Sequence, residues 1–365
     1  MPILTPKDGG GQPSDFGKYS LAEIASQPQC WIDCLKRLEK GGTLREIAKR
    51  FVSSPEWVFV GCGSSYYIAL AAAASWTSIT GTRARAVPAS ELLLFPDLAF
   101  SGMKEFVPVL ISRSGQTSEV LRVAQLLSDK RIPSVAISCA PGQKLEKMAT
   151  TAILLPDADE QSTVMTRSFT SMLLALQCLA ATVAGNRGLL ESFQSLPAVA
   201  ERVLRDLPQR IREFIDDSSF SDYVCLGQGP YYGLACESAL KVTEMSCTYS
   251  QSFHTLEFRH GPKSIISGSV LTTFLLSGSN HDAEVEVLEE IKELGAKTLV
   301  VASHVSRRAR ASADFAVDLE CDLPEISCLA PFVFAGQLAG AFTALRKGLD
   351  PDNPANLSRV VVLAD

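Results

Sequence analysis

The sequence of 365 residues is 46% hydrophobic and 20% charged, so it can bury a sizeable core, and its length predicts two domains. Its formal net charge is −6 and it contains no basic block, which argues against nucleic acid as the main partner and leaves room only for a local basic pocket. This composition is typical of a globular protein.

The chain begins with residues 1–17, which are rich in Gly and Pro and which we predict to be disordered. This N-terminus lacks the charged-then-apolar layout of a signal peptide, and the apolar stretch at 171–185 is too short to span a bilayer. We therefore expect a cytoplasmic protein that does not contact a membrane. A helical segment is predicted within residues 20–41.

The ten cysteines form no CxxC unit, and we expect them to be reduced core residues.

The chain then repeats itself. Residues 57–78 and 223–245 each predict a short apolar strand, a Gly-x-Gly turn and a helix that opens with a Tyr-Tyr pair. A second strand and helix and then a third strand follow in both copies. Strands that alternate with helices of this length predict right-handed crossovers and a parallel sheet covered on both faces. We therefore expect an α/β protein with two doubly wound domains, at 18–200 and 201–365.

The second strand of the first copy ends in the turn ISRSGQTSEV, residues 111–120. Ligands bind beyond the carboxyl ends of strands in such sheets, where the N–H groups and dipole of the next helix favour anions. Ser112, Ser114 and Thr117 offer neutral hydroxyl donors, and Gly115 lets the backbone come close. These groups suit a phosphate monoester, whereas a triphosphate would call for the Walker lysine. An ordinary capped turn is the alternative, but the second copy reads LSGSNHDAE and lacks this pattern.

The first Gly-x-Gly turn gives weaker evidence. A dinucleotide site is one interpretation, but the third glycine and the acidic residue that it requires are missing. Ser64 and Ser65 open the next helix, as further donors or as helix caps. We expect no cofactor.

Residues 237–264 contain the highest density of candidate catalytic side chains. Glu237, Lys241 and Glu244 are spaced i, i+4 and i+7 and share one helix face, which is either a solvated face or an active-site face. His260, in the loop motif RHGP, is a candidate proton carrier, although a lone loop histidine is more often structural. Neither an HExxH motif nor a cysteine cluster accompanies it, so we expect no metal.

Six motifs occur in a characteristic order: GCGSSYY, SRSGQTSEV, MTRSFTSM, ESALKVTEMS, EFRHGP and DPDNPANLSRVV. From about residue 18 to its end, the sequence resembles paired sugar isomerase (SIS) domains. It is similar to the isomerase half of glucosamine-6-phosphate synthase and to stand-alone amino-sugar-phosphate deaminases, isomerases and deglycases. The synthase also carries a glutaminase domain, which is not seen before these motifs, so we expect that ammonia is not drawn from glutamine here.

The resemblance implies roles for individual residues. Its substrate-binding positions correspond to Ser64, Ser112, Arg113, Ser114, Thr117, Thr163, Glu237 and Arg359. The resemblance implies that Glu244 moves a proton between C1 and C2 with Lys241 beside it. It also implies that His260 opens the sugar ring from a neighbouring subunit, and hence a homodimer.

One position departs from the synthase pattern. Arg359 stands where the synthase has a lysine that forms a Schiff base, and a guanidinium does not serve as that nucleophile. Either the imine forms with ammonia or with the substrate amine, or another amine, such as that of Lys241 or Lys263, replaces it. Arg359 is free to bind a substrate anion.

We therefore expect an aldose–ketose isomerase and deaminase that converts glucosamine 6-phosphate or galactosamine 6-phosphate into a ketose 6-phosphate and ammonia. A fructosamine-6-phosphate deglycase and a non-catalytic sugar-phosphate sensor are the alternatives.

Overall fold

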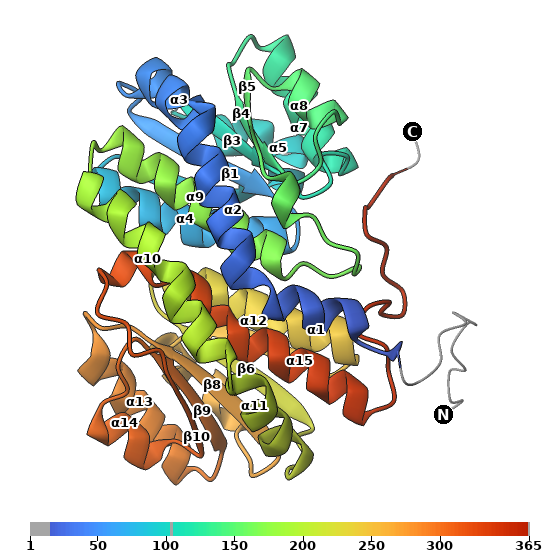
Figure 1. Cartoon of the computed structure of the whole chain (residues 1–365), viewed down its shortest axis with the longest axis vertical. Coiled ribbons are helices and arrows are strands. Elements are labelled where there is room, and N and C mark those ends of the chain that lie inside the picture. The colour runs from blue at the N-terminus through green and yellow to red at the C-terminus, as the bar shows by residue number, and fades with distance from the viewer. Residues whose placement is uncertain (1–14, 103–104, 364–365) are drawn as a thin grey trace.

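A computed structural model describes residues 15–102 and 105–363 (Figure 1). Most of the segment predicted to be disordered, residues 1–14, lies outside the described residues. Residues 15–17, the last three of the predicted segment 1–17, form a turn that leads into the first helix. The backbone N–H of Gly17 donates to Asp350 Oδ1 at 3.1 Å. For residues 15–17 the prediction of disorder is therefore wrong, because the C-terminal part of the chain fixes them.

Two parallel five-stranded sheets form the framework. The first has the strand order β2-β1-β3-β4-β5, and the second, read from its far edge, has the same order as β7-β6-β8-β9-β10. The strands of the first sheet are β1 (Glu56–Gly61), β2 (Arg83–Pro88), β3 (Val107–Ile111), β4 (Val135–Ser138) and β5 (Thr151–Leu154). Those of the second are β6 (Asp222–Gly227), β7 (Ser250–His254), β8 (Val270–Leu276), β9 (Lys297–Ala302) and β10 (Phe315–Asp318). The predicted pair of doubly wound sheets is confirmed.

The central strands were predicted, but the edge strands β2, β5, β7 and β10 were not. The central strand β3 is buried at every position, whereas in each of the four edge strands most positions are only partly buried. An edge strand has one hydrogen-bonded neighbour, so its sequence lacks the continuous apolar run by which central parallel strands are identified.

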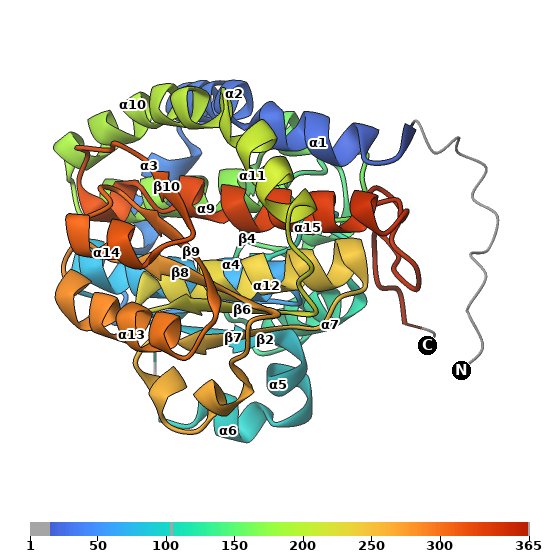
Figure 2. The same ribbon diagram turned by 90° about the horizontal axis from the view of Figure 1, so that it is seen from below.

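Helices cover both faces of the two sheets (Figures 1 and 2). Those associated with the first half of the chain are α1 (Lys18–Ala25), α2 (Gln27–Gly41), α3 (Thr43–Phe51), α4 (Ser64–Thr80), α5 (Ala89–Leu94), α6 (Pro96–Phe100), α7 (Ser118–Asp129), α8 (Lys144–Met148), α9 (Arg167–Val183) and α10 (Arg187–Leu204). The remainder are α11 (Leu207–Asp216), α12 (Pro230–Ser246), α13 (His281–Glu293), α14 (Arg307–Ser312) and α15 (Phe334–Arg346). Short 3₁₀ turns include η3 (Glu257–Arg259) and η5 (Glu325–Ser327). The domain boundary predicted between residues 200 and 201 falls inside α10.

Four helices, α4, α9, α12 and α15, lie between the two sheets (Figure 1). Glycines bring their backbones close together. A Cβ on Gly233 of α12 would lie 2.7 Å from the carbonyl oxygen of Tyr67 and 2.8 Å from the nitrogen of Ala71 on α4. A Cβ on Gly340 of α15 would lie 2.7 Å from the carbonyl oxygen of Lys241 on α12. A side chain at position 233 would push the two halves of the molecule apart, and one at position 340 would push α15 away from α12.

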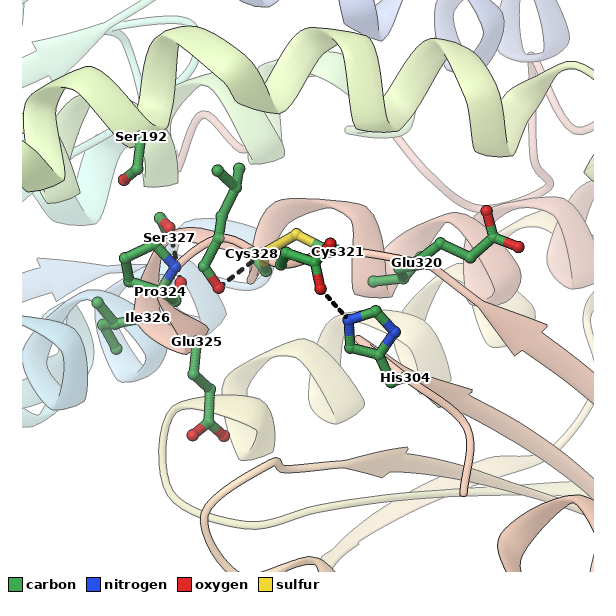
Figure 3. The surroundings of a disulfide bond; sticks show 12 residues. Ser192, His304, Glu320, Cys321, Pro324, Glu325, Ile326, Ser327 and Cys328 are labelled. Carbon is green, nitrogen blue, oxygen red and sulfur yellow. Dashed lines mark hydrogen bonds and ion pairs between the residues drawn. A yellow bond between two sulfur atoms is a disulfide. The ribbon is translucent and has the colours of Figure 1, made fainter. Parts of the chain in front are cut away.

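The expectation that all ten cysteines are reduced is wrong for one pair. Cys321 and Cys328 form a disulfide in the loop between β10 and α15 (Figure 3). The loop folds back over η5 and brings together two buried sulfur atoms that are seven residues apart. Among the free cysteines, Cys62 is half-buried and Cys247 is exposed, so these two are not core residues either.

None of the helices in the described ranges combines the length and hydropathy that a membrane span requires.

Candidate active site

The serine- and threonine-rich turn follows β3 at the carboxyl edge of the first sheet. Ser112 Oγ and Thr117 Oγ1 lie 3.0 Å apart, and Ser114 Oγ accepts the N–H of Gln116 at 3.2 Å. Gly115 adopts a left-handed conformation, with φ of 62°, and a Cβ there would lie 3.0 Å from the Cβ of Gln143. The turn therefore gathers hydroxyl groups at the start of α7, and it depends on glycine for its conformation.

The turn after β1 lies beside this one. Strands β1 and β3 are hydrogen-bonded neighbours, so their carboxyl ends meet at one edge. The thiol of Cys62, between β1 and α4, contacts Glu119 Oε2 on α7 at 3.6 Å. Ser64, the first residue of α4, is thus positioned next to the hydroxyl-lined turn.

The predicted helix face on α12 is buried and not solvated. Lys241 Nζ lies 3.3 Å from Glu237 Oε1 and also pairs with the carboxylate of Glu244. The side chains of Glu237 and Lys241 are fully buried, whereas that of Glu244 is 18% exposed. The alternative of an ordinary solvated face is therefore wrong, and Glu244 is the member of the group that reaches accessible space.

This face belongs to the second half of the chain but meets the first. Lys241 Nζ donates to Ser64 Oγ at 3.2 Å, and Ser64 Oγ donates to Glu237 Oε1 at 3.2 Å. The reason is that α12 runs antiparallel to α4: its beginning packs near Ala71, and its later turns reach the start of α4. The carboxylates therefore lie at the ligand-binding edge of the first sheet.

Burial changes the protonation of this group. It raises the pKa of Glu237 to about 8, because the effect of desolvation exceeds the opposing effect of Lys241. Burial alone would lower the pKa of Lys241, but the two carboxylates outweigh it and raise that pKa. Glu237 Oε2 has no hydrogen-bond partner among the described residues, and burying it without one costs more for a charged carboxylate than for a neutral carboxyl group. At neutral pH the arrangement favours a charged lysine beside a protonated Glu237.

The Glu237→Gln variant should become more stable relative to the wild type as pH rises from about 5 to about 9. Because the pKa of Glu237 is higher in the folded protein than in the unfolded chain, the proton on Glu237 stabilises the fold. This contribution is complete below the ordinary pKa of 4.5, and it is lost as pH rises through about 8. The glutamine amide resembles the protonated acid and does not titrate. Thermal midpoints measured across this range check the prediction, with Glu293→Gln on the exposed face of α13 as the control. A difference that does not change with pH would contradict it.

The guanidinium of Arg113 contacts other parts of the protein, and the predicted role of this residue in holding the substrate stays a prediction. Its guanidinium is buried and turned away from the turn's hydroxyl groups, and it pairs with Glu160 at 3.2 Å. It also donates to the carbonyl oxygens of Thr163 at 2.8 Å and Val164 at 3.0 Å. These protein partners occupy both terminal nitrogens, so Arg113 does not present them to a phosphate in this structure.

Thr163 and Arg359 lie near the turn through backbone contacts. The carbonyl oxygen of Arg359 accepts from Arg113 at 3.1 Å, while its own guanidinium pairs with Asp159 at 2.6 Å near the surface. The N–H of Thr163 donates to the carbonyl oxygen of Asp352 at 3.0 Å. Both residues belong to segments that border the turn, but Arg359 directs its charge to Asp159.

His260 is not brought to this group within one chain. It is exposed at the end of η3, and its ring makes no hydrogen bond or ion pair with a described residue. Its contribution from a neighbouring subunit stays a prediction.

Glu160 is a residue that the sequence analysis missed. Its side chain is fully buried, and it accepts hydrogen bonds from the N–H and hydroxyl groups of Thr166 and Ser168 as well as from Arg113. An acidic residue in a loop carries no local sign of burial, so spacing alone could not have found it.

Within residues 15–102 and 105–363, no group of three or more His, Cys, Asp or Glu is placed to hold a metal ion.

Residues 51–182 match the SIS domain family. These residues form a SIS domain. The second sheet repeats the strand order of this domain, so the chain contains two doubly wound domains of the same topology in tandem.

The chain as a whole is similar to proteins that act on sugar phosphates. A glutamine–fructose-6-phosphate aminotransferase of Methanothermobacter thermautotrophicus is 26% identical over 351 residues, which cover 95% of this chain and 58% of that protein. The chain thus spans less than two thirds of the length of this relative. The solved structure of glucosamine-6-phosphate deaminase from Thermotoga maritima is 29% identical, with a TM-score of 0.76 over 94% of this chain and 99% of that one. Tagatose-6-phosphate ketose/aldose isomerase from Escherichia coli shares the fold, with a TM-score of 0.77 at 21% identity over 99% of both chains.

Proposed function

We propose that this protein is a sugar-phosphate isomerase that deaminates an amino-sugar 6-phosphate to a ketose 6-phosphate and ammonia. The observation that carries the proposal is the contact between Lys241 Nζ and Ser64 Oγ at 3.2 Å. It joins the carboxylate group on α12 to the edge that carries the hydroxyl-lined turn, and the proposal requires one open-chain hexose phosphate to contact both. The similarity to a glucosamine-6-phosphate deaminase over almost the whole chain supports the same reaction.

The chemistry requires one base that serves two neighbouring carbons. The hydroxyl groups of residues 112–117 hold the phosphate and place the far end of the sugar near Glu244. Glu244 takes the proton from C2 and returns it to C1, while the aldehyde oxygen at C1 gains a proton and becomes a hydroxyl group. The amine at C2 is then an imine. Water adds to this imine, ammonia leaves, and a ketone at C2 remains.

Lys241 and Glu237 prepare Glu244 for this role. The pair between Lys241 and Glu244 fixes the carboxylate, and the other side of Lys241 is held by Glu237 and Ser64. Because Lys241 is fully buried and charged, it can stabilise negative charge that develops on the substrate oxygen during proton transfer.

The protein is proposed to act as a homodimer in which His260 opens the sugar ring in the partner's site. Two observations support this. His260 is exposed and makes no hydrogen bond or ion pair with a described residue of its own chain. Leu94 on α5, Phe95 between the two helices and Leu98 on α6 are 72%, 56% and 74% exposed. Figure 2 shows the η3 region and these helices on the same side of the molecule.

Mixing Glu244→Gln and His260→Gln proteins, each inactive alone, should restore about a quarter of the activity through mixed dimers. No recovery after subunit exchange would contradict the shared site.

The reaction itself is tested by incubating the protein with glucosamine 6-phosphate, galactosamine 6-phosphate and fructoselysine 6-phosphate. Ammonium, free lysine and ketose phosphate are assayed separately. We expect ammonium and ketose phosphate from at least one amino sugar. Lysine release from the third compound alone would indicate a deglycase, and thermal stabilisation by these compounds without any product would indicate a sensor.

A further inference from the structure

Arg113 joins three segments that are far apart in the sequence. Its backbone belongs to the hydroxyl-lined turn 112–117, and its carbonyl oxygen accepts from the N–H of Cys139 at 2.9 Å. Its Nη1 donates to the loop 159–166, and its Nη2 donates to the carbonyl oxygens of Thr163 and Arg359. One guanidinium, only 6% exposed, therefore holds the turn, this loop and the C-terminal segment 359–363 together.

The charge of Arg113 is neutralised inside the protein. Glu160 Oε2 pairs with Nη1 at 3.2 Å, and Glu160 Oε1 accepts from the N–H of Thr166 at 2.6 Å and from its hydroxyl group at 2.8 Å. A buried pair with its other donors and acceptors satisfied is held in one geometry, and removing either partner leaves an uncompensated charge. The pair therefore fixes positions and does not supply a cation to the ligand.

The C-terminal segment also contacts the start of α7. The N–H of Ser118 donates to the carbonyl oxygen of Val361 at 3.2 Å, and the N–H of Leu363 donates to Ser118 Oγ at 3.0 Å. Ser118 follows Thr117 directly, so the segment lies against the turn that carries the hydroxyl groups. The segment is thus connected to the turn at two places, Arg113 and Ser118.

We propose that Arg113 is a positioning residue that couples the hydroxyl-lined turn to the C-terminal segment 359–363 and to the loop 159–166. Through this coupling its guanidinium sets the affinity for the phosphate group without donating a hydrogen bond to it. The inference rests on the proposed function for the identity of the ligand, but the coupling itself is independent of turnover. Because Lys241 and Glu244 lie on α12 and do not contact Arg113, loss of the coupling should weaken substrate binding and leave proton transfer intact.

The Arg113→Lys variant tests this. Lysine keeps the charge beside Glu160, but its single nitrogen cannot serve three carbonyl oxygens and a carboxylate at once. We expect KM to rise about tenfold while kcat stays within about twofold. The lost hydrogen bonds come from a charged group and position the phosphate-binding turn, whereas the residues that transfer the proton keep their contacts. Arg308→Lys, which alters an exposed paired arginine on α14, is the matched control and should change neither constant. A fall in kcat with unchanged KM would overturn the proposal.

A truncation after Ser358 separates coupling from a general loss of structure. In the shortened chain, Arg113→Lys should raise KM less than it does in the full chain, because one of its partners is already gone. An equal effect in both chains would overturn the coupling to the C-terminal segment.

A third measurement does not depend on catalysis. Limited proteolysis of the full chain, followed by mass spectrometry, should show cleavage within 359–363 accelerated by Arg113→Lys and not by Arg308→Lys. Calorimetry with inorganic phosphate should show a matching loss of affinity. Should the protein turn over none of the offered sugars, these two measurements still decide the inference: unchanged cleavage and unchanged phosphate affinity would overturn it.

Discussion

Replacing Glu244 by glutamine should lower kcat by about 10²–10⁴-fold, the range that positioned general bases contribute. Glutamine keeps the size of the side chain but cannot accept the proton from C2. The fold should persist, because Lys241 keeps Glu237 at 3.3 Å and Ser64 at 3.2 Å as partners, and Glu237 can release its proton to balance the charge of Lys241 once Glu244 is replaced. Steady-state kinetics on the amino sugar that releases ammonium measure the loss, and the thermal midpoint reports the fold.

Two further measurements make this test specific. The variant should still bind the sugar phosphate, since the hydroxyl groups of the turn 112–117 are untouched, and calorimetry checks this. Glu293→Gln, an exposed position on α13, is the matched control and should retain full activity. Activity of the Glu244→Gln protein close to that of the control would remove Glu244 from the proposed mechanism.

Replacing Gly233 by alanine should cost about 1–3 kcal/mol of stability and a large part of the activity. The added Cβ would meet the backbone of α4 at 2.7 and 2.8 Å, and backbone atoms cannot rotate away as a side chain can. Helix α12 must then move away from α4, which separates Lys241 from Ser64. Chemical denaturation measures the stability, and kinetics on the same samples measure the activity.

Gly188→Ala is the matched control for this prediction. Gly188 lies in the first turn of α10, and a Cβ there would meet only the side chain of Asn186 at an ordinary 3.8 Å. Alanine favours helix over glycine, so this variant should be equally stable or more stable by up to about 1 kcal/mol. If Gly233→Ala behaved like Gly188→Ala, the close helix crossing would not be needed to assemble the site.

Much of the local structure could be predicted from the sequence. The Gly-x-Gly turns, the helices after them and the hydroxyl-rich turn at 112–117 follow from residue spacing within short windows. The common face of Glu237, Lys241 and Glu244 follows from helical geometry alone. Edge strands escaped prediction because their partial burial produces no continuous apolar run.

The orientation of Arg113 could not be read from its neighbours in the chain. Its motif places it among hydroxyl donors, yet its side chain turns toward Glu160, which is 47 residues away in the sequence, and toward Arg359, which is 246 residues away. The pairing of Cys321 with Cys328 likewise depends on a loop that folds back over η5, and its spacing of seven residues predicts no bond.

The sequence by itself determined which residues share a turn or a helix face, because the backbone geometry of turns and helices acts over a few residues. Only the tertiary structure decided which turn meets which face. Lys241 and Ser64 are 177 positions apart, and their contact exists because glycines let α12 pack antiparallel and close against α4. Contacts of that kind depend on how whole surfaces fit, and no short window of sequence carries that information.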